Sequence, residues 1–345
     1  MNTIKEGSIP LAERFFERGR AFLGSRYPIL CGAMTWVSDP VLIAAVCNAG
    51  GFGSLAGGNT PVGMLEEQIA ETYRRTDRPF GINLITIAPA YREHLDLARE
   101  MKLPFIIFAG SFPREKEVAL AKSAGARVLC FASTYSIAER MIRYGADALI
   151  IEGSEAGGHI GHVSLAVLLQ QVLFQFTDIP IFVAGGIAGG RMAAHLLLMG
   201  AAGIQMGTRF AVATESCAHP RFKEFFLRAE ARDAVATPQF DSRLPVVAVR
   251  ALRNKGHEDF RKLQLDLVQK LDAGLIHREQ AQMKVEEFWM GALRRAVVDG
   301  DVERGSLMAG QSVGLVDRIQ PVEEIIREIV LEVEQELQQT KQSLA

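Results

Sequence analysis

The amino-acid sequence predicts an α/β protein, a (β/α)8 TIM barrel with a mostly helical lid domain inserted after strand 8. The first observation is that short β-rich runs alternate with longer helical patterns eight times from residue 27 onward. The second is that the short runs are continuously apolar, which is typical of a parallel sheet covered on both faces. A doubly wound open sheet is the alternative, because local patterns do not show whether a sheet closes.

Each repeat contributes one strand and one helix. The expected strands are residues 27–33, 52–56, 79–85, 104–110, 127–133, 148–153, 180–185 and 203–208. The expected helices are residues 41–50, 64–76, 92–101, 115–125, 136–145, 164–176 and 191–200. Four of these helices end at a glycine, a residue that tolerates the left-handed conformation closing a helix C-terminus: Gly50, Gly125, Gly145 and Gly200.

The alternation stops after Phe210. Residues 215–300 contain a turn-rich stretch and two charged amphipathic helices around 257–298, without strand alternation, so we expect a helical lid. Residues 301–345 then return to the barrel and end in a helix with one apolar stripe, at Val322, Ile325, Ile326, Ile329, Val333 and Leu337. The sequence therefore predicts four segments: an N-terminal extension over 1–26, the barrel over 27–214, the lid over 215–300 and the returning segment with its helix over 301–345.

Composition limits the classes of function. The chain has 345 residues, 48% of them hydrophobic, and a formal net charge of −2, which gives no sign of a nucleic-acid partner. Its four cysteines form no CxxC pair, and no secretory signal or 18-residue apolar run is present. We therefore expect a cytoplasmic protein that binds neither nucleic acid nor membrane.

Glycine-bearing turns follow the seventh and eighth expected strands, at Gly185, Gly186, Gly207 and Thr208. In a barrel of this kind such turns form a phosphate cradle from backbone N–H groups at the C-terminal ends of the strands. The simpler interpretation is that these glycines only make tight turns. The run "AGGFGSLAGGN" at 49–59 resembles a dinucleotide fingerprint, but a helix precedes it and a strand crosses it, so a Rossmann site is rejected.

His159 lies in the glycine-rich stretch "EGSEAGGHIGH" after the sixth strand. Flanking glycines let the backbone approach a ligand closely, and an imidazole there can act as an acid, a base or a hydrogen-bond donor. An ordinary surface histidine is the alternative. His162 and Glu155 suggest a metal site, but no further ligand has suitable spacing, so no metal is expected.

Three other residues stand at the ends of strands. The Asn83 amide and the Glu152 carboxyl can bind the edge of a heterocycle, or can simply cap the local backbone. Cys31 lies in the first glycine-rich turn, where a thiol can touch a ligand, but we expect it to be buried and inert.

Several motifs together resemble the nitronate monooxygenase superfamily: "GAMTWVSDPVLIAAVCNAGGFGSLAGGN", "PFGINL", "EGSEAGGHIG", "AGGIAGG" and "IQMGTRF". The segments "TESCAHPRFKEFFLRA", "AVRALRN" and "GDVERGSLMAGQSVGLV" are similar to the FMN-dependent enoyl-acyl-carrier-protein reductase II branch, the FabK type. The resemblance covers about residues 27–330 and implies a TIM barrel with non-covalent FMN at the C-terminal ends of its strands.

The resemblance also implies roles for individual residues. His159 matches the active-site histidine. The residues implied to contact FMN are Ala33, Met34, Thr35, Asn83, Glu152, Gly157, Gly158, Gly185, Gly186, Gln205, Met206, Gly207 and Thr208, with Met308 and Gln311 facing it from the returning segment. The chain departs from the family at Cys31, where glutamine is usual, and at Gly189, where an acid is commoner.

The function that follows from the resemblance is reduction of an enoyl thioester by NADH or NADPH through FMN. The expected partners are a small-molecule or acyl-thioester substrate, an acyl carrier protein, and a second copy of the chain in a homodimer. The alternatives are a nitronate monooxygenase, an NAD(P)H:quinone reductase, and a barrel that binds a phosphate ligand without turnover.

Overall fold

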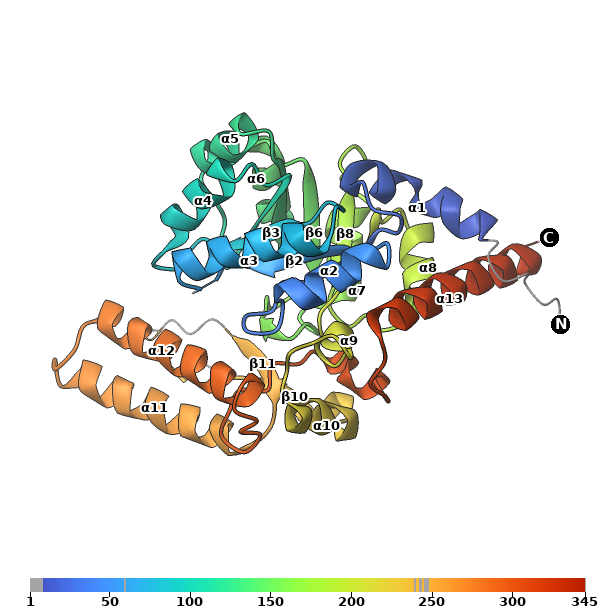
Figure 1. Ribbon diagram of the computed structural model, residues 1–345. Helices are drawn as coiled ribbons and strands as arrows, with labels where there is room; N and C mark the ends of the chain where they lie inside the picture. Colours follow the sequence, from blue (N-terminus) through green and yellow to red (C-terminus); the bar gives the residue numbers. More distant parts are fainter. Residues whose placement is uncertain (1–8, 59, 239, 242–243, 245–247, 345) are drawn as a thin grey trace.

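The computed structural model of the chain describes residues 9–58, 60–238, 240–241, 244 and 248–344. Eight parallel strands close into a barrel in the order β1-β2-β3-β4-β5-β6-β8-β9, which confirms the predicted TIM barrel (Figure 1). The strands are β1 (Ile29–Cys31), β2 (Phe52–Ala56), β3 (Gly81–Ile85), β4 (Phe105–Ala109), β5 (Arg127–Ala132), β6 (Ala148–Glu152), β8 (Ile181–Ala184) and β9 (Gly203–Met206). Each expected strand contains one of them.

Helices surround the barrel as the sequence predicts. They are α2 (Pro40–Asn48), α3 (Val62–Arg75), α4 (Tyr91–Glu100), α5 (Glu115–Ser123), α6 (Tyr135–Arg143), α7 (Leu165–Leu168) and α8 (Gly190–Leu198). The helix expected over 164–176 changes at Leu169–Leu173 into a π-helix. The four predicted terminating glycines have φ between 89° and 105°, the left-handed region that favours glycine.

The barrel interior is filled by side chains rather than by a channel. Phe52, Phe105 and Phe182 lie in it with apolar residues from the other strands. The Phe52 and Phe105 rings pack edge to face with centroids 4.9 Å apart. This filled interior leaves the ends of the strands, and not the barrel axis, as the place for a ligand.

The N-terminal extension forms helix α1 (Pro10–Leu23), which covers the N-terminal end of the barrel. Leu23 is fully buried in the interior cluster, and the Phe22 ring lies 5.9 Å from the rings of both Phe105 and Phe182. Helix α1 and the inserted lid therefore lie at opposite ends of the barrel (Figure 1).

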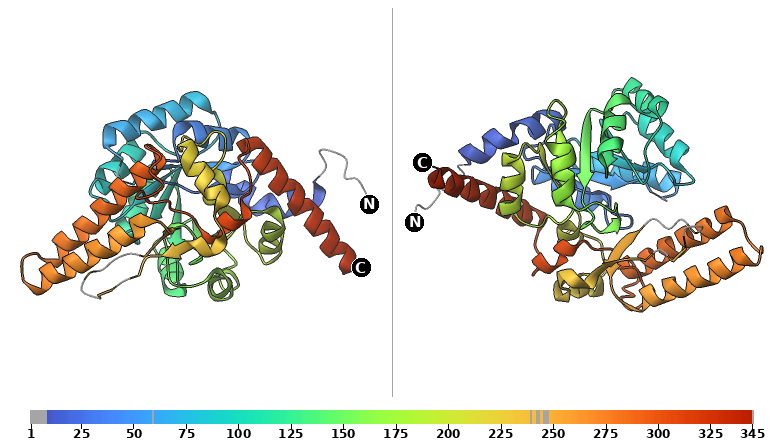
Figure 2. Two further views of the ribbon diagram at one scale, coloured as in Figure 1. Left: turned by 90° about the horizontal axis from the view of Figure 1, so that it is seen from below. Right: turned by 180° about the vertical axis from the view of Figure 1, so that it is seen from behind.

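The insertion after β9 begins with the short α9 (Thr208–Ala211) and continues through α10 (Pro220–Arg228) to a helical hairpin, α11 (Lys255–Asp272) and α12 (Arg278–Val297). These helices confirm the mostly helical lid, and Figures 1 and 2 show the hairpin projecting from the barrel on the side of α3 and α4. The hairpin has its own core, in which the rings of Phe260 and Trp289 pack at a tilt of 45° with centroids 4.3 Å apart.

The expectation that the insertion lacks strands is wrong. It contains β10 (Ala234–Ala236) and β11 (Val249–Leu252), and β11 pairs with β7 (Gly158–His159) in a sheet of order β10-β11-β7. These strands are too short to show a periodic pattern, and β7 lies in the loop after β6. Residues 239, 242–243 and 245–247 of the predicted turn-rich stretch lie outside the described residues.

The C-terminal helix α13 (Val322–Ser343) packs beside α8 and α1, and its six predicted stripe residues are all buried. It therefore packs against the ring of helices around the barrel, in contact with α8, α1 and α2. The chain reaches it from the lid through a 3-10 helix, Gln311–Leu315. No helix among the described residues is long and apolar enough to cross a membrane.

The contact between α1 and the barrel floor gives a first prediction. A methyl group at Gly19 would collide with the carbonyl oxygen of Ala202, so Gly19→Ala should lower the free energy of unfolding by about 1–3 kcal/mol, as overpacking does. The matched control is Gly63→Ala in α3, where an added methyl group would meet no other described residue within 4 Å; this change should stabilise by about 0.4–1 kcal/mol. Denaturant titration checks both, and equal midpoints for the two variants would contradict this packing of α1.

Candidate active site

A cavity of about 510 Å³ opens at the C-terminal ends of the barrel strands. Loops after the strands form its floor and walls, while Trp289 and Leu293 of α12 and Met308 of the returning segment also line it. Pockets of this size and position are where barrels of this kind bind ligands.

The glycine turns after β8 and β9 form one side of the cavity. Gly185 and Gly186 have φ of 91° and 72°, which only glycine adopts readily, and both line the cavity with Gly207 and Thr208. The N–H groups of Gly186, Ile187 and Thr208 donate no hydrogen bond to any residue that the structure describes. Backbone donors left open in a concave wall are suited to an anion such as phosphate.

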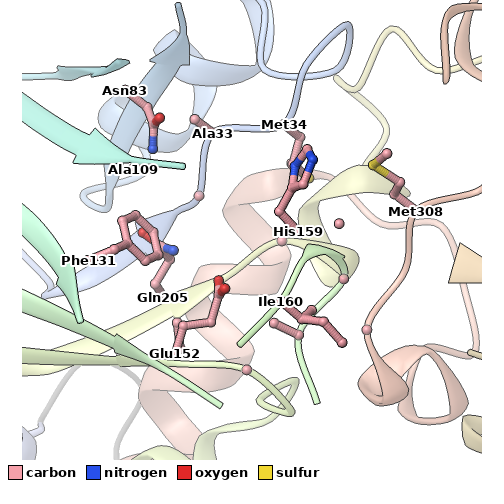
Figure 3. A pocket seen from close by; sticks show the side chains of 18 of the residues that line it. Ala33, Met34, Asn83, Ala109, Phe131, Glu152, His159, Ile160, Gln205 and Met308 are labelled. Atoms are coloured by element: carbon pink, nitrogen blue, oxygen red, sulfur yellow. The ribbon is translucent and has the colours of Figure 1, made fainter. Parts of the chain in front are cut away.

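Polar side chains on the cavity wall also lack partners. Asn83 at β3 and Gln205 at β9 are 6% and 8% exposed, and within the described chain neither side-chain amide makes a hydrogen bond. The Glu152 carboxyl at the end of β6 lines the same wall (Figure 3). Buried polar groups are rarely left unpaired, so this arrangement indicates a ligand with donors and acceptors along one edge.

The environment of Glu152 changes its chemistry. Burial raises the pKa of its carboxyl to about 8, because a charged carboxylate is poorly solvated there. The raised pKa favours the protonated carboxyl near neutral pH, the form that can donate a hydrogen bond to a ligand as well as accept one.

His159 projects into the cavity from the side facing these polar groups, near Met34 and Met308 (Figure 3). Its backbone is fixed by pairing with β11, in which Val249 stands opposite His159, and by the Ile160 N–H, which donates to the Ala248 carbonyl at 2.9 Å. The backbone of His159 is thus hydrogen-bonded like that of a strand residue, although it lies in a glycine-rich loop.

The returning segment holds the same loop from the other side. A Cβ on Gly157 would lie 2.5 Å from the Gly310 nitrogen, so only glycine permits this approach. The Gln311 N–H donates to the Glu155 carbonyl at 2.9 Å, and the Gly310 N–H donates to Thr208 Oγ1 at 3.0 Å. The Glu155 carboxylate accepts from the Leu165 N–H at 3.0 Å and so caps α7.

Every residue that the sequence assigned to the site, except Gln311, lines this cavity. The lining residues are Ala33, Met34, Thr35, Asn83, Glu152, Gly157, Gly158, His159, Gly185, Gly186, Gln205, Met206, Gly207, Thr208 and Met308. Gln311 was expected to face the ligand, but it does not line the cavity; its backbone instead joins the return segment to the loop of His159.

His162 lies outside this cavity, beside a second one of about 290 Å³ that it lines with Arg250 and Thr237. Among the described residues, no group of three or more His, Cys, Asp or Glu is placed to hold a metal ion. Cys31 is buried outside the cavity, and burial raises the pKa of its thiol, which makes it unreactive. Beside Gly189, where the resemblance makes an acid commoner, the Glu332 carboxylate of α13 accepts from the Gly190 N–H at 2.6 Å.

The sequence did not predict two parts of the cavity, one of its walls and its roof. The wall follows β4 and β5 and includes Ser111, Phe112, Phe131 and Ser133; the roof is Trp289 and Leu293. The wall could have been found from the rule that strand ends build the site, although only Gly110 marks it in the sequence. Nothing local marks the roof, because it depends on how the lid folds back.

The chain is similar in sequence and fold to several known proteins. The sequence profile described as nitronate monooxygenase matches residues 17–101 and 85–332. A protein of Mycobacterium tuberculosis, (3aS,4S,5R,7aS)-5-hydroxy-7a-methyl-1-oxo-octahydro-1H-indene-4-carboxyl-CoA dehydrogenase, is 32% identical over 336 residues, which cover 90% of this chain and 94% of that protein.

Two solved structures share the whole fold. FabK from Thermotoga maritima is similar with a TM-score of 0.83 and 38% identity, covering 94% of this chain and 98% of its own. Nitroalkane oxidase from Streptomyces ansochromogenes is similar with a TM-score of 0.78 and 26% identity, covering 95% of this chain and 100% of its own.

The raised pKa of Glu152 predicts a pH-dependent stability. An unfolded glutamate has a pKa of about 4.3, so between about pH 4.3 and pH 8 folding must keep a proton on Glu152 that the unfolded chain releases. This cost is absent below pH 4 and grows until about pH 8. Glu152→Gln removes it, so the melting temperature of the flavin-free variant should exceed that of the wild type by a margin that widens from pH 5 to pH 8. A difference in melting temperature that stays the same at every pH would contradict a carboxyl that remains protonated in the folded protein.

Proposed function

Because the chain belongs to the nitronate monooxygenase family, a family of FMN flavoproteins, we propose that it is an FMN-dependent oxidoreductase that reduces the carbon–carbon double bond of an enoyl thioester. NADH or NADPH is the electron donor. The observation that carries the proposal is that His159 faces a wall of unpaired polar groups across a cavity roofed by apolar side chains. The wall fits a flavin, and the roof fits an acyl chain.

The residues of the cavity match the parts of FMN. The open N–H groups of Gly186, Ile187 and Thr208 suit its phosphate. Asn83, Gln205 and the protonated Glu152 offer donors and acceptors to the polar edge of its ring system. Backbone from Ala33, Met34, Thr35, Gly157 and Gly158 can approach the ring, while Met206 and Gly207 continue the phosphate side.

When bound, FMN supplies the hydride transfer that amino-acid side chains cannot perform. The chain contributes orientation and a proton. The enoyl thioester would take this hydride at its β-carbon, and His159 would deliver a proton to the α-carbon, so that the double bond takes up two hydrogens. Trp289, Leu293 and Met308 close the cavity above the substrate and exclude water from it.

The thioester substrate is supported by two relatives. The Mycobacterium tuberculosis relative is named as a dehydrogenase of a carboxyl-CoA, which is a thioester. The FabK type, which the chain resembles in its motifs and in the Thermotoga maritima structure, implies an enoyl thioester on an acyl carrier protein. We propose CoA or an acyl carrier protein as the carrier.

Nitronate oxidation with oxygen is the second candidate, favoured by the family profile and by the likeness to the Streptomyces nitroalkane oxidase. In that reaction His159 would remove the α-proton of a neutral nitroalkane. Comparing NADH and NADPH oxidation with crotonyl thioester, quinone and nitroalkane separates these activities from each other and from a protein that binds FMN without turnover.

The cofactor cradle is tested by Gly186→Val. Valine is strained at a φ of 72°, and its branched side chain obstructs the open N–H groups, so FMN should be lost. The control is Gly200→Val, which suffers similar strain at a φ of 105° but lies in the turn between α8 and β9, away from the cavity. Flavin content after purification measures the difference. If both variants keep equal flavin, the glycines after β8 only form a turn.

The proton donor is tested by His159→Ala. The variant should fold and retain FMN, because the phosphate cradle lies on other loops, while turnover of enoyl thioester falls by about 10²–10⁴-fold. His162→Ala, three residues along and outside the cavity, should leave turnover unchanged.

The same variant distinguishes the two candidates. A monooxygenase that lacks His159 would fail with neutral nitroalkanes and still oxidise preformed nitronates, which need no base. Full activity of His159→Ala on every substrate would contradict its assignment in both reactions.

A further inference from the structure

One wall of the cavity has no role in the proposed contacts with FMN. It is built by the loops after β4 and β5, including Ser111, Phe112 and Ser133. In the barrel order, β4 stands opposite β9, where the phosphate cradle lies. Ala109 and Phe131, at the ends of these two strands, face the cavity in Figure 3. This side of the cavity is therefore open to a second ligand beside the cofactor.

Phe112 is the prominent side chain of this wall. It lines the cavity and yet is 44% exposed, so a large aromatic surface remains in contact with water. The Arg140 guanidinium of α6 lies over its ring, with Cζ 4.8 Å from the centroid. An exposed ring at a pocket rim is suited to stacking with a planar heterocycle, which would remove that surface from water.

Arg140 does not itself line the cavity, but its contact with Phe112 brings the guanidinium to the cavity rim. Within the described part of the chain, no carboxylate lies within ion-pair distance of its guanidinium. A guanidinium beside an aromatic ring supplies both a flat surface and several donors for phosphate oxygens. The Ser133 hydroxyl lies on the same wall and, in the described structure, has no hydrogen-bond partner.

We propose that Phe112 and Arg140 bind the adenosine diphosphate moiety of a ligand that reacts in this cavity. Phe112 stacks with the adenine ring, and Arg140 contacts the phosphates. The inference rests on the proposed function, because the two molecules of that reaction that carry this moiety are NAD(P)H and a CoA thioester. Both molecules contain an adenine base joined to phosphates. The wall recognises this adenosine diphosphate part and not the nicotinamide or the thioester that reacts.

Binding of ADP to the FMN-loaded protein tests the proposal without turnover. Titration calorimetry should give a dissociation constant about 10–100-fold weaker for Phe112→Ala, the loss expected for one base–aromatic stack. Arg140→Gln should also weaken binding of ADP, and should affect adenosine, which has no phosphate, much less. Flavin content must be unchanged in both variants.

The matched control is Tyr135→Ala. Tyr135 is 43% exposed and lies on α6, the helix that also carries Arg140. Its ring stacks on that of Phe176 with centroids 5.2 Å apart, and it does not line the cavity. It should bind ADP as the wild type does. Failure of the wild type to bind ADP at millimolar concentration, or equal affinities in Phe112→Ala and the wild type, would overturn the proposal.

Steady-state kinetics identify the source of the moiety. If it is CoA, Phe112→Ala raises the KM of crotonyl-CoA and leaves unchanged the KM of crotonyl-pantetheine, which lacks the nucleotide. If it is the dinucleotide, the variant raises the KM of NADH or NADPH and leaves the KM of both thioesters unchanged. Because the ADP titration needs no turnover, binding of ADP at Phe112 with no reduction of either thioester would reject the proposed function and keep this inference.

Discussion

The pairing of β7 with β11 is the contact on which the site depends. Without it, the loop after β6 is a run of glycines around His159, a sequence with little preference for any backbone conformation. Arg250 of β11 adds a side-chain contact, since its Nε donates to the Ser154 carbonyl at 3.0 Å. A strand of the lid therefore orders the loop that carries the candidate catalytic residue, so lid and loop form one structural unit.

The same arrangement joins segments from both ends of the chain. Met34 follows the first strand, whereas Met308 comes 274 residues later, and both line the cavity beside His159. Thr208 holds the returning backbone through its hydroxyl. A ligand in this cavity contacts the barrel, the lid and the return segment together, so we expect binding to stabilise the whole assembly rather than one loop.

The sequence predicts the barrel well because its signals are local: apolar strands, helices and the glycines that end them. The glycine turns after β8 and β9, and the positions of Asn83, Glu152 and His159, followed from the same logic, since strand ends converge at one face of a closed barrel. The other expected site residues came only from the resemblance to the nitronate monooxygenase superfamily. What could not be predicted depends on contacts between distant residues. The partner of β11 is a two-residue strand in another loop, the raised pKa of Glu152 comes from burial, and Phe112 has no neighbouring motif.

The most direct test of the proposed activity is an anaerobic spectral titration of the FMN-loaded protein. NADH or NADPH should bleach the oxidised-flavin absorbance, and one equivalent of crotonyl-CoA or crotonyl-acyl carrier protein, added without oxygen, should restore it while butyryl thioester forms. The contrary result is a flavin that stays bleached with both thioesters and recovers only when oxygen is admitted, or one that a nitronate reduces and nicotinamides do not.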